Sequence, residues 1–343
     1  MRPEVLARPG SRLCHVTTLR IGVLGAARIT PAALIRPAKA VDEVEVSAVA
    51  ARDPERAAAF AQRHGIPRCA GSYEELVADP DLDAIYVPLP NARHAEWTLA
   101  ALAAGKHVLC EKPLTSNAAE ATVVAAAAED ANRVVMEAFH YRYHPMFARA
   151  LELSATLGPL KHVETELCFP LPRFGDIRYQ LDLAGGAMMD AGCYAVHAMR
   201  TLGVPLGGGE PEVVSARAAL RSPQVDRMLV ADYRFPSGAT ARTRASMWSR
   251  HVLGVSARVV GEEGELRILN YLAPQVYHRL TVRTAAGTRR ERIPGEATYT
   301  YQLRAFAGSV LRGEENLTPA SDAVNTMGLI DAAYRAAGLD PRG

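Results

Sequence analysis

The fold is decided by the stretch Leu19-Arg-Ile-Gly-Val-Leu-Gly25-Ala-Ala-Arg-Ile-Thr30. A short apolar run that ends in glycine is typical of a buried parallel strand followed by a tight turn. Of the G-x-G-x-x-G fingerprint of dinucleotide-binding turns, Gly25 is kept, while Ala27 and Thr30 fill the other glycine positions. An ordinary strand–helix turn would look similar. The context favours a dinucleotide site, because small residues let backbone N–H groups approach a pyrophosphate.

Downstream of this turn, short apolar runs alternate with helical segments. We expect strands at residues 44–50, 83–88, 107–110 and 134–136, and helices at 32–41, 55–64, 94–104 and 117–131. Gly65 and Gly105 follow two of these helices, as C-cap glycines do. This alternation predicts βαβ units and an α/β Rossmann domain with a doubly wound parallel sheet.

The pattern changes after about residue 145. Longer strand-like segments that alternate polar and apolar residues favour a large, mainly antiparallel open sheet. They lie at 161–169, 211–220, 227–235, 239–248, 254–260, 265–270 and 279–284, with helices expected at 146–157, 185–202, 301–312 and 322–337. We therefore predict a loose extension over residues 1–18, a dinucleotide-binding domain over 19–143 and an α+β substrate and dimerisation domain over 144–343.

Composition excludes several classes of function. The chain has 343 residues, and its 39 Lys plus Arg nearly balance 37 Asp plus Glu, which argues against a nucleic-acid partner. No apolar run suits a membrane span and no signal peptide is apparent, so we expect a cytoplasmic protein. The five cysteines form no CxxC pair, so no metal is expected.

Lysine is rare, with Lys39, Lys106, Lys112 and Lys161 against 35 arginines. Each lysine is therefore a candidate for chemistry that arginine, which keeps its proton, cannot do.

The end of the second expected strand bears on the choice of cofactor. An NAD site usually places an acidic residue there to bind the ribose hydroxyls, but this chain has Ala51, followed by Arg52. A guanidinium at this point suits the 2′-phosphate of NADP. Alternatively, Arg52 is an exposed loop residue and Asp53 binds the ribose. We favour NADP over NAD.

Three further stretches carry a resemblance to a known family. They are Val87-Pro-Leu-Pro-Asn-Ala-Arg-His94, Gly105-Lys-His-Val-Leu-Cys-Glu-Lys-Pro113 and Gly185-Gly-Ala-Met-Met-Asp-Ala-Gly-Cys-Tyr194. Together with the first turn, these stretches resemble the Gfo/Idh/MocA oxidoreductase family. The resemblance covers the chain from Leu19 to the last helix. The resemblance implies that Lys112, of the Glu-Lys-Pro tripeptide, is catalytic. A surface lysine before a proline turn is the alternative.

Asp190 and Tyr194 are four residues apart on an expected helix, and therefore on one face. The resemblance implies that Tyr194 shares proton transfer with Lys112, and that Asp190 orients Lys112 or touches the nicotinamide ribose. Whether Lys112 or Tyr194 is the terminal proton donor stays open. A helix-terminal aspartate and a core tyrosine are the structural alternative.

The first turn, the end of the second strand and the resemblance together give the candidate cofactor-binding residues. These are Gly25, Ala27, Arg28, Ile29, Ala51, Arg52, Tyr73, Leu89, Asn91, His94, Glu111 and Arg178. His140 and Tyr141, at the expected domain junction, and His197, one turn beyond Tyr194, are candidates for binding substrate hydroxyls. Packing explains these three nearly as well.

The expected function is NADP(H)-dependent hydride transfer between the nicotinamide and a carbonyl or alcohol of a sugar-like or cyclic polyol substrate. The alternatives are a trans-dihydrodiol dehydrogenase, a non-catalytic dinucleotide-binding regulator of the same family, and an NAD-dependent glycoside hydrolase. A regulator would need neither Lys112 nor Tyr194. We expect a homodimer or higher homo-oligomer that forms through the second sheet.

Overall fold

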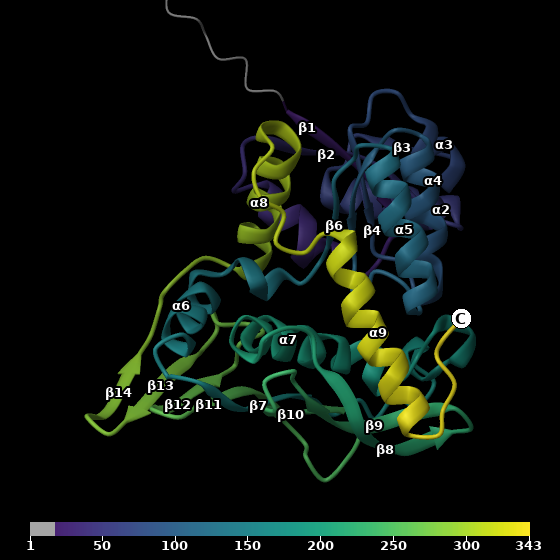
Figure 1. The fold of residues 1–343 in the computed structure, drawn as a ribbon. Coiled ribbons are helices and arrows are strands. Elements are labelled where there is room, and N and C mark those ends of the chain that lie inside the picture. Colours follow the sequence, from purple (N-terminus) through teal and green to yellow (C-terminus); the bar gives the residue numbers. More distant parts are fainter. Residues whose placement is uncertain (1–17) are drawn as a thin grey trace, which may run out of the picture.

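The computed structural model describes residues 18–343, so the predicted extension over residues 1–18 lies, apart from its last residue, outside the described part. Two sheets organise these residues (Figure 1). No helix among them is both long enough and apolar enough to cross a membrane.

The first sheet has six parallel strands in the order β3-β2-β1-β4-β5-β6. Their bounds are β1 Leu19–Leu24, β2 Val44–Ala50, β3 Arg68–Cys69, β4 Ala84–Val87, β5 His107–Cys110 and β6 Val135–Glu137. All four residues of β4 are buried, as expected for a strand covered on both faces. The strand order reverses between β1 and β4. In such sheets, ligands bind at the carboxyl ends of the strands beside this reversal.

Helices cover both faces of this sheet, and polar side chains start three of them. The helices are α2 Pro54–His64, α3 Tyr73–Ala78, α4 His94–Ala103 and α5 Ala118–Asp130. The side chains of Asp53, Ser72 and Asn117 accept hydrogen bonds from backbone N–H groups in the first turns of α2, α3 and α5. Neither β3 nor α3 was expected, because each is too short for a periodic pattern.

The first helix differs from the expected α-helix over residues 32–41. The chain forms a π-helical turn over Pro31–Ile35, followed by the short helix α1 over Arg36–Ala38. Pro37 has no backbone N–H and cannot make the hydrogen bond that a regular α-helix would need there. The backbone N–H of Arg36 donates instead to the carbonyl of Pro31.

The second sheet has eight strands in the order β14-β13-β12-β11-β7-β10-β9-β8. Only β7 and β10 pair in parallel; the other neighbours are antiparallel. The bounds are β7 Leu160–Cys168, β8 Glu212–Ser222, β9 Val225–Arg234, β10 Thr240–Ser246, β11 Gly254–Gly261, β12 Gly264–Leu269, β13 Arg279–Thr284 and β14 Gly287–Glu291. Strand β14 was not expected, because its exposed polar residues resemble a turn. The doubly wound α/β domain and the mainly antiparallel second sheet confirm the predicted fold class.

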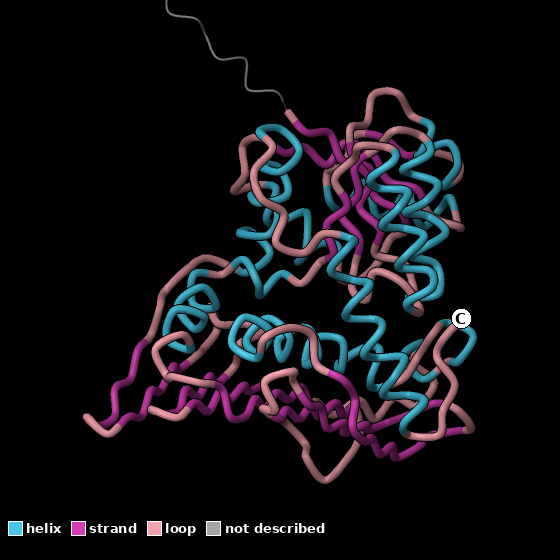
Figure 2. Tube along the Cα trace, in the orientation of Figure 1, coloured by secondary structure: helices cyan, strands magenta, loops and turns pink. Residues whose placement is uncertain are grey.

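Helices cover one face of the second sheet (Figure 2). They are α6 Pro145–Ser154, α7 Cys193–Gly207 and α9 Ala320–Ala336. On β7, Val163, Thr165 and Leu167 point toward these helices and are buried, while Glu164 and Glu166 point away. Figure 2 shows no helix of the described residues on the opposite face.

The last part of the chain returns to the first domain. Leu303, Phe306 and Ala307 of α8 (Thr298–Arg312) belong to the same buried cluster as Ile21 of β1. Helix α9 packs on α5 and on β8 (Figure 1). A division at residue 143 assigns α8 to the second domain, whereas its apolar face packs on the first. These two helices therefore tie the two sheets together.

Candidate active site

The turn after β1 holds a glycine in the left-handed region, with little room for a side chain. Gly25 has a φ angle of +92°, and a Cβ atom there would lie 3.2 Å from Leu89 Cδ2 and 3.5 Å from the Tyr73 hydroxyl. A residue with a side chain would be strained in this conformation. Arg28 and Ile29 are exposed beside the turn, and Ala27 is half-buried. The residues present therefore fit a pyrophosphate approached by backbone N–H groups.

The end of β2, next to this turn, is followed by an exposed arginine. Ala51 is buried and Arg52 is exposed. The Asp53 carboxylate accepts from the N–H groups of Glu55 at 3.0 Å and Arg56 at 3.3 Å, so it serves as the N-cap of α2. This engagement weakens the alternative that Asp53 binds the ribose. Arg56, which sequence reasoning missed, donates from Nη2 to the Ala26 carbonyl at 3.0 Å and brings a second guanidinium to the turn.

Two of the predicted cofactor residues, Asn91 and His94, use their side chains inside the protein. Asn91 donates to the Ala184 carbonyl of the second domain at 3.2 Å. The two ring nitrogens of His94 lie 2.6 Å from the Pro113 carbonyl oxygen and 2.8 Å from the Leu89 carbonyl oxygen. These two residues therefore hold the loops that flank the site.

Lys112 follows β5 at the carboxyl edge of the first sheet. Its Nζ donates to the Asp190 carbonyl oxygen at 2.9 Å, lies 3.6 Å from Asp190 Oδ1 and sits 4.6 Å from the centre of the Tyr194 ring. Burial lowers the pKa of Lys112, but the nearby Asp190, Cys193 and Glu111 more than offset it, so the pKa is raised. Lys112 is therefore a cation near neutral pH.

Glu111 supports Lys112 from the same loop. It is buried, and its Oε1 accepts from the Tyr86 hydroxyl at 2.7 Å. Burial raises the pKa of Glu111, although the Tyr86 hydrogen bond and the Lys112 cation act in the opposite direction. Glu111 is therefore a buried neighbour of Lys112.

Asp190 lies in a π-helical segment, Met188–Gly192, that precedes α7. Such segments are often found at functional sites. Arg178 Nε lies 3.1 Å from Asp190 Oδ1, so Asp190 has a cation on each side. The start of the segment is fixed by Asp226, whose Oδ2 accepts from the Met188 N–H at 2.8 Å and whose Oδ1 pairs with buried Arg342 at 3.1 Å. Sequence reasoning missed this support.

Tyr194 is the second residue of α7 and is 6% exposed. Burial, followed by Tyr299, Glu111, Cys193 and Asp190, raises the pKa of Tyr194 well above its usual value. The side chain is therefore a neutral phenol near neutral pH. The structure brings Lys112, Asp190 and Tyr194 together, and a phenol beside an ammonium can exchange a proton with a substrate oxygen.

His197 and Tyr141 lie in the core behind Tyr194. The Tyr141 hydroxyl is 2.5 Å from His197 Nδ1, and His197 Nε2 lies 3.4 Å from Asp322 Oδ2. The His197 ring stacks on Phe139 with 4.0 Å between centroids. With both ring nitrogens engaged, this geometry favours packing over substrate binding. His140, the third substrate candidate, contacts Tyr194 directly.

The described residues contain no group of side chains that could hold a metal ion. Across residues 18–343, no three His, Cys, Asp or Glu side chains gather as a metal site would need. The expectation of a metal-free site stays a prediction.

The first domain matches the description "Oxidoreductase family, NAD-binding Rossmann fold" over residues 19–139, and the second matches "GFO/IDH/MocA C-terminal domain" over residues 147–267. The chain belongs to the Gfo/Idh/MocA oxidoreductase family. It is therefore an NAD(P)-dependent oxidoreductase, as the resemblance implied.

Several similar proteins carry the names of enzymes that act on sugars. D-xylose 1-dehydrogenase (NADP(+)) 2 of Haloferax volcanii is 39% identical over 322 residues, which cover 93% of this chain and 97% of the relative. The 3-ketoreductase KijD10 of Actinomadura kijaniata, solved with NADP and TDP-benzene, has a TM-score of 0.84 at 30% identity and covers 93% of this chain and 98% of its own. The aldose-aldose oxidoreductase of Caulobacter crescentus, solved with glycerol, has a TM-score of 0.85 at 27% identity and covers 94% and 98%.

Proposed function

We propose that this oxidoreductase transfers a hydride between NADP(H) and a carbonyl or alcohol of a sugar-like substrate, with aldoses as the first candidates. The observation that carries the proposal is the cluster in which Lys112 contacts Asp190 and the face of the Tyr194 ring. When bound, the nicotinamide supplies or accepts the hydride, as it does in dehydrogenases generally.

Within this cluster we assign the proton to Tyr194. Its raised pKa keeps the phenol protonated, so in the reducing direction it can give its proton to the substrate oxygen. Lys112 remains an ammonium, and its charge stabilises the phenolate that forms. Asp190 holds Lys112 in position, and Arg178 in turn holds the Asp190 carboxylate. In the oxidising direction the proton moves the other way, from the substrate hydroxyl to Tyr194.

The preference for NADP rests on charge at the end of β2. Arg52 is exposed beside the turn, Arg56 reaches Ala26, and the nearby Asp53 carboxylate is occupied by the start of α2. Arginine recognises phosphate through paired N–H donors. We therefore assign Arg52 and Arg56 to the 2′-phosphate.

The test is a cofactor-reduction screen of the purified protein with NADP⁺ and NAD⁺ against aldoses, cyclic polyols, nucleotide-linked sugars and a trans-dihydrodiol. We expect turnover with an aldose and a preference for NADP⁺. The dihydrodiol belongs in the screen because a Xenopus laevis trans-1,2-dihydrobenzene-1,2-diol dehydrogenase is 42% identical over 195 residues, although these cover only 55% of this chain and 57% of that protein. Cofactor binding without turnover of any alcohol or carbonyl would contradict the proposal and favour a regulator.

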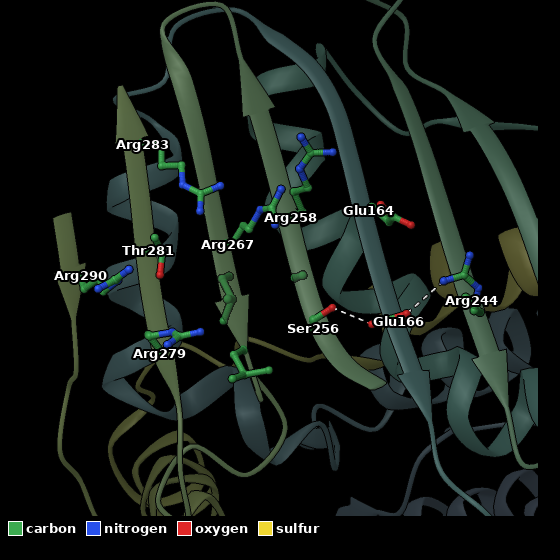
Figure 3. Close-up of a pocket in the computed structure, with 13 residues that line it drawn as sticks. Glu164, Glu166, Arg244, Ser256, Arg258, Arg267, Arg279, Thr281, Arg283 and Arg290 are labelled. Carbon is green, nitrogen blue, oxygen red and sulfur yellow. Dashed lines mark hydrogen bonds and ion pairs between the residues drawn. The ribbon is translucent and has the colours of Figure 1, made fainter. Parts of the chain in front are cut away.

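We also propose that two copies pair through the uncovered face of the second sheet. This face carries a hollow of about 490 Å³ lined largely by charged side chains (Figure 3). There, Arg244 pairs with Glu166 at 3.1 Å, while Arg279 and Arg290 have no ion-pair partner among residues 18–343. Two-fold pairing would bring the same patch of each copy together. Arg244→Glu should therefore shift the mass measured by light scattering toward that of the monomer. The control Arg63→Glu, on α2, should leave the mass unchanged. If the unmodified protein is itself a monomer, the proposed dimer is wrong.

A further inference from the structure

His140 is a buried titratable side chain that contacts the Tyr194 hydroxyl and that the mechanism has not used. It begins the short 3-10 helix His140–Tyr143, between β6 and α6, and is 5% exposed. Its Nε2 lies 3.3 Å from the Tyr194 hydroxyl oxygen, and its Nδ1 lies 2.8 Å from Thr298 Oγ1. The ring packs against Tyr299 with 4.0 Å between centroids. His140 thus links Tyr194 to the first residue of α8.

The protonation state of His140 follows from its surroundings. Burial, with a smaller contribution from Lys112, lowers the pKa of His140 to about 3, so only one ring nitrogen carries a hydrogen. The Thr298 hydroxyl is buried, and among residues 18–343 its side chain has no other hydrogen-bond partner. A buried hydroxyl hydrogen needs an acceptor, and His140 Nδ1 is the one within reach. Thr298 therefore donates to Nδ1, which leaves the hydrogen of His140 on Nε2, facing Tyr194.

We propose that His140 is a positioning residue that donates its Nε2–H to the Tyr194 hydroxyl oxygen and leaves the phenol hydrogen free for the substrate. This inference rests on the proposed function. In the reducing direction, the substrate carbonyl carbon gains a hydride and its oxygen takes the Tyr194 proton, which gives the alcohol. The electron pair of the broken O–H bond stays on Tyr194 as a phenolate, which accepts from His140 Nε2–H. The proton later returns to Tyr194 from solvent.

The groups that face Tyr194 divide by their effect on the phenolate. Glu111, Asp190, Cys193 and Tyr299 disfavour it and raise the pKa of Tyr194. Lys112 favours it through its charge, 4.6 Å from the ring centre, and His140 favours it through the hydrogen bond. Because the bond to the phenolate is stronger than the bond to the phenol, removing it should lower kcat more than it raises KM.

The kinetic test compares His140→Leu with His140→Gln, whose amide can place a donor near the position of Nε2. Hydrogen bonds to charged groups are the stronger ones, so we expect His140→Leu to lower kcat for carbonyl reduction by about ten- to a hundredfold, with KM little changed. His140→Gln should recover most of the loss. In a Tyr194→Phe background, His140→Leu should have almost no further effect. An unchanged kcat in His140→Leu, or an equal loss in the Tyr194→Phe background, would overturn the proposal.

A second measurement needs no substrate and separates this proposal from the proposed function. In protein labelled with ¹⁵N-histidine, the side-chain resonances of His140, assigned by their loss in His140→Gln, report which nitrogen is protonated. We expect hydrogen on Nε2 and a shift of that resonance in Tyr194→Phe. A hydrogen on Nδ1 would overturn the inference even if sugars are turned over. Failure of the substrate screen alone would remove the proposed function and leave this tautomer result standing.

Discussion

The two edges of the candidate site differ in burial and in how their charges are held. At the cofactor edge, Arg52 and Arg56 are exposed, and of their two guanidinium groups only that of Arg56 has a hydrogen-bond partner among the described residues. At the catalytic edge, Lys112, Asp190 and Tyr194 are largely buried and contact one another. The difference indicates two separate tasks. We propose that the exposed cations select the cofactor by charge, and that the buried cluster sets the protonation of the groups that react.

If the two edges have separate tasks, a substitution at the catalytic edge should have the largest effect on kcat. Lys112→Ala removes the cation that stabilises the Tyr194 phenolate, and we expect kcat to fall by about 10³-fold, within the range of acid–base catalysis. NADPH affinity, measured by calorimetry, should change little. Lys39→Ala, which removes an exposed lysine just after α1, is the matched control. Near-native kcat in Lys112→Ala would remove Lys112 from the mechanism.

The buried edge should also make the protein sensitive to acid. Burial lowers the pKa of His140 from 6.5 to about 3, so below pH 6.5 the unfolded chain binds a proton that the native state does not. The stability due to neutral His140 is complete above its unfolded pKa and is lost as the pH falls. From about pH 7 to about pH 5 this amounts to about 2 kcal/mol of unfolding free energy.

Denaturant titrations at these two pH values check this second prediction. His140→Gln should lose about 2 kcal/mol less than the unmodified protein on acidification. Exposed His251→Gln should behave as the unmodified protein does. Equal losses in all three proteins would show that His140 is not kept neutral by burial.

A smaller effect is expected at the exposed edge. NADPH should bind at least about tenfold more tightly than NADH, as a charge-assisted arginine–phosphate contact implies. Arg52→Ala should erase most of this difference by weakening NADPH alone, and Ala51→Asp should go further because its carboxylate repels the phosphate. Arg63→Ala, at the other end of α2, should leave both affinities unchanged. Equal binding of NADH and NADPH by the unmodified protein would refute the assignment of Arg52.

The smallest effect is expected from Asp53. Its carboxylate caps α2, so Asp53→Ala should lower the unfolding free energy by about 1 kcal/mol. The ratio of NADPH to NADH affinity should not change. A specific loss of NADH affinity in this variant would instead assign Asp53 to the ribose.

Much of the fold could be predicted from local pattern. The alternation of apolar runs and helices predicts the main strands and helices of the first domain along the chain, and period-two segments predict most strands of the second sheet. The pattern could not show that α8 packs on the first sheet, because an amphipathic helix does not specify its partner. It also missed β14, whose residues are polar and mostly exposed.

The site divides in the same way. Lys112, Asp190 and Tyr194 stand in short motifs that the sequence displays. Their supports come from distant parts of the chain. Thr298 and Arg342 reach His140 and Asp226 across 158 and 116 residues, and no local spacing marks such pairs. Arg56 was detectable in principle, since it follows Arg52 by four residues at the start of a helix.

One measurement tests the separation of the two edges most directly: the NADPH dissociation constant of the unmodified protein, Arg52→Ala, Lys112→Ala and the double variant. We expect Lys112→Ala to bind within about threefold of the unmodified protein and Arg52→Ala to bind about tenfold or more weakly. The double variant should match Arg52→Ala, because sites that share no partner contribute independently. A large loss in Lys112→Ala, or a double variant far from the sum of the single effects, would contradict the account.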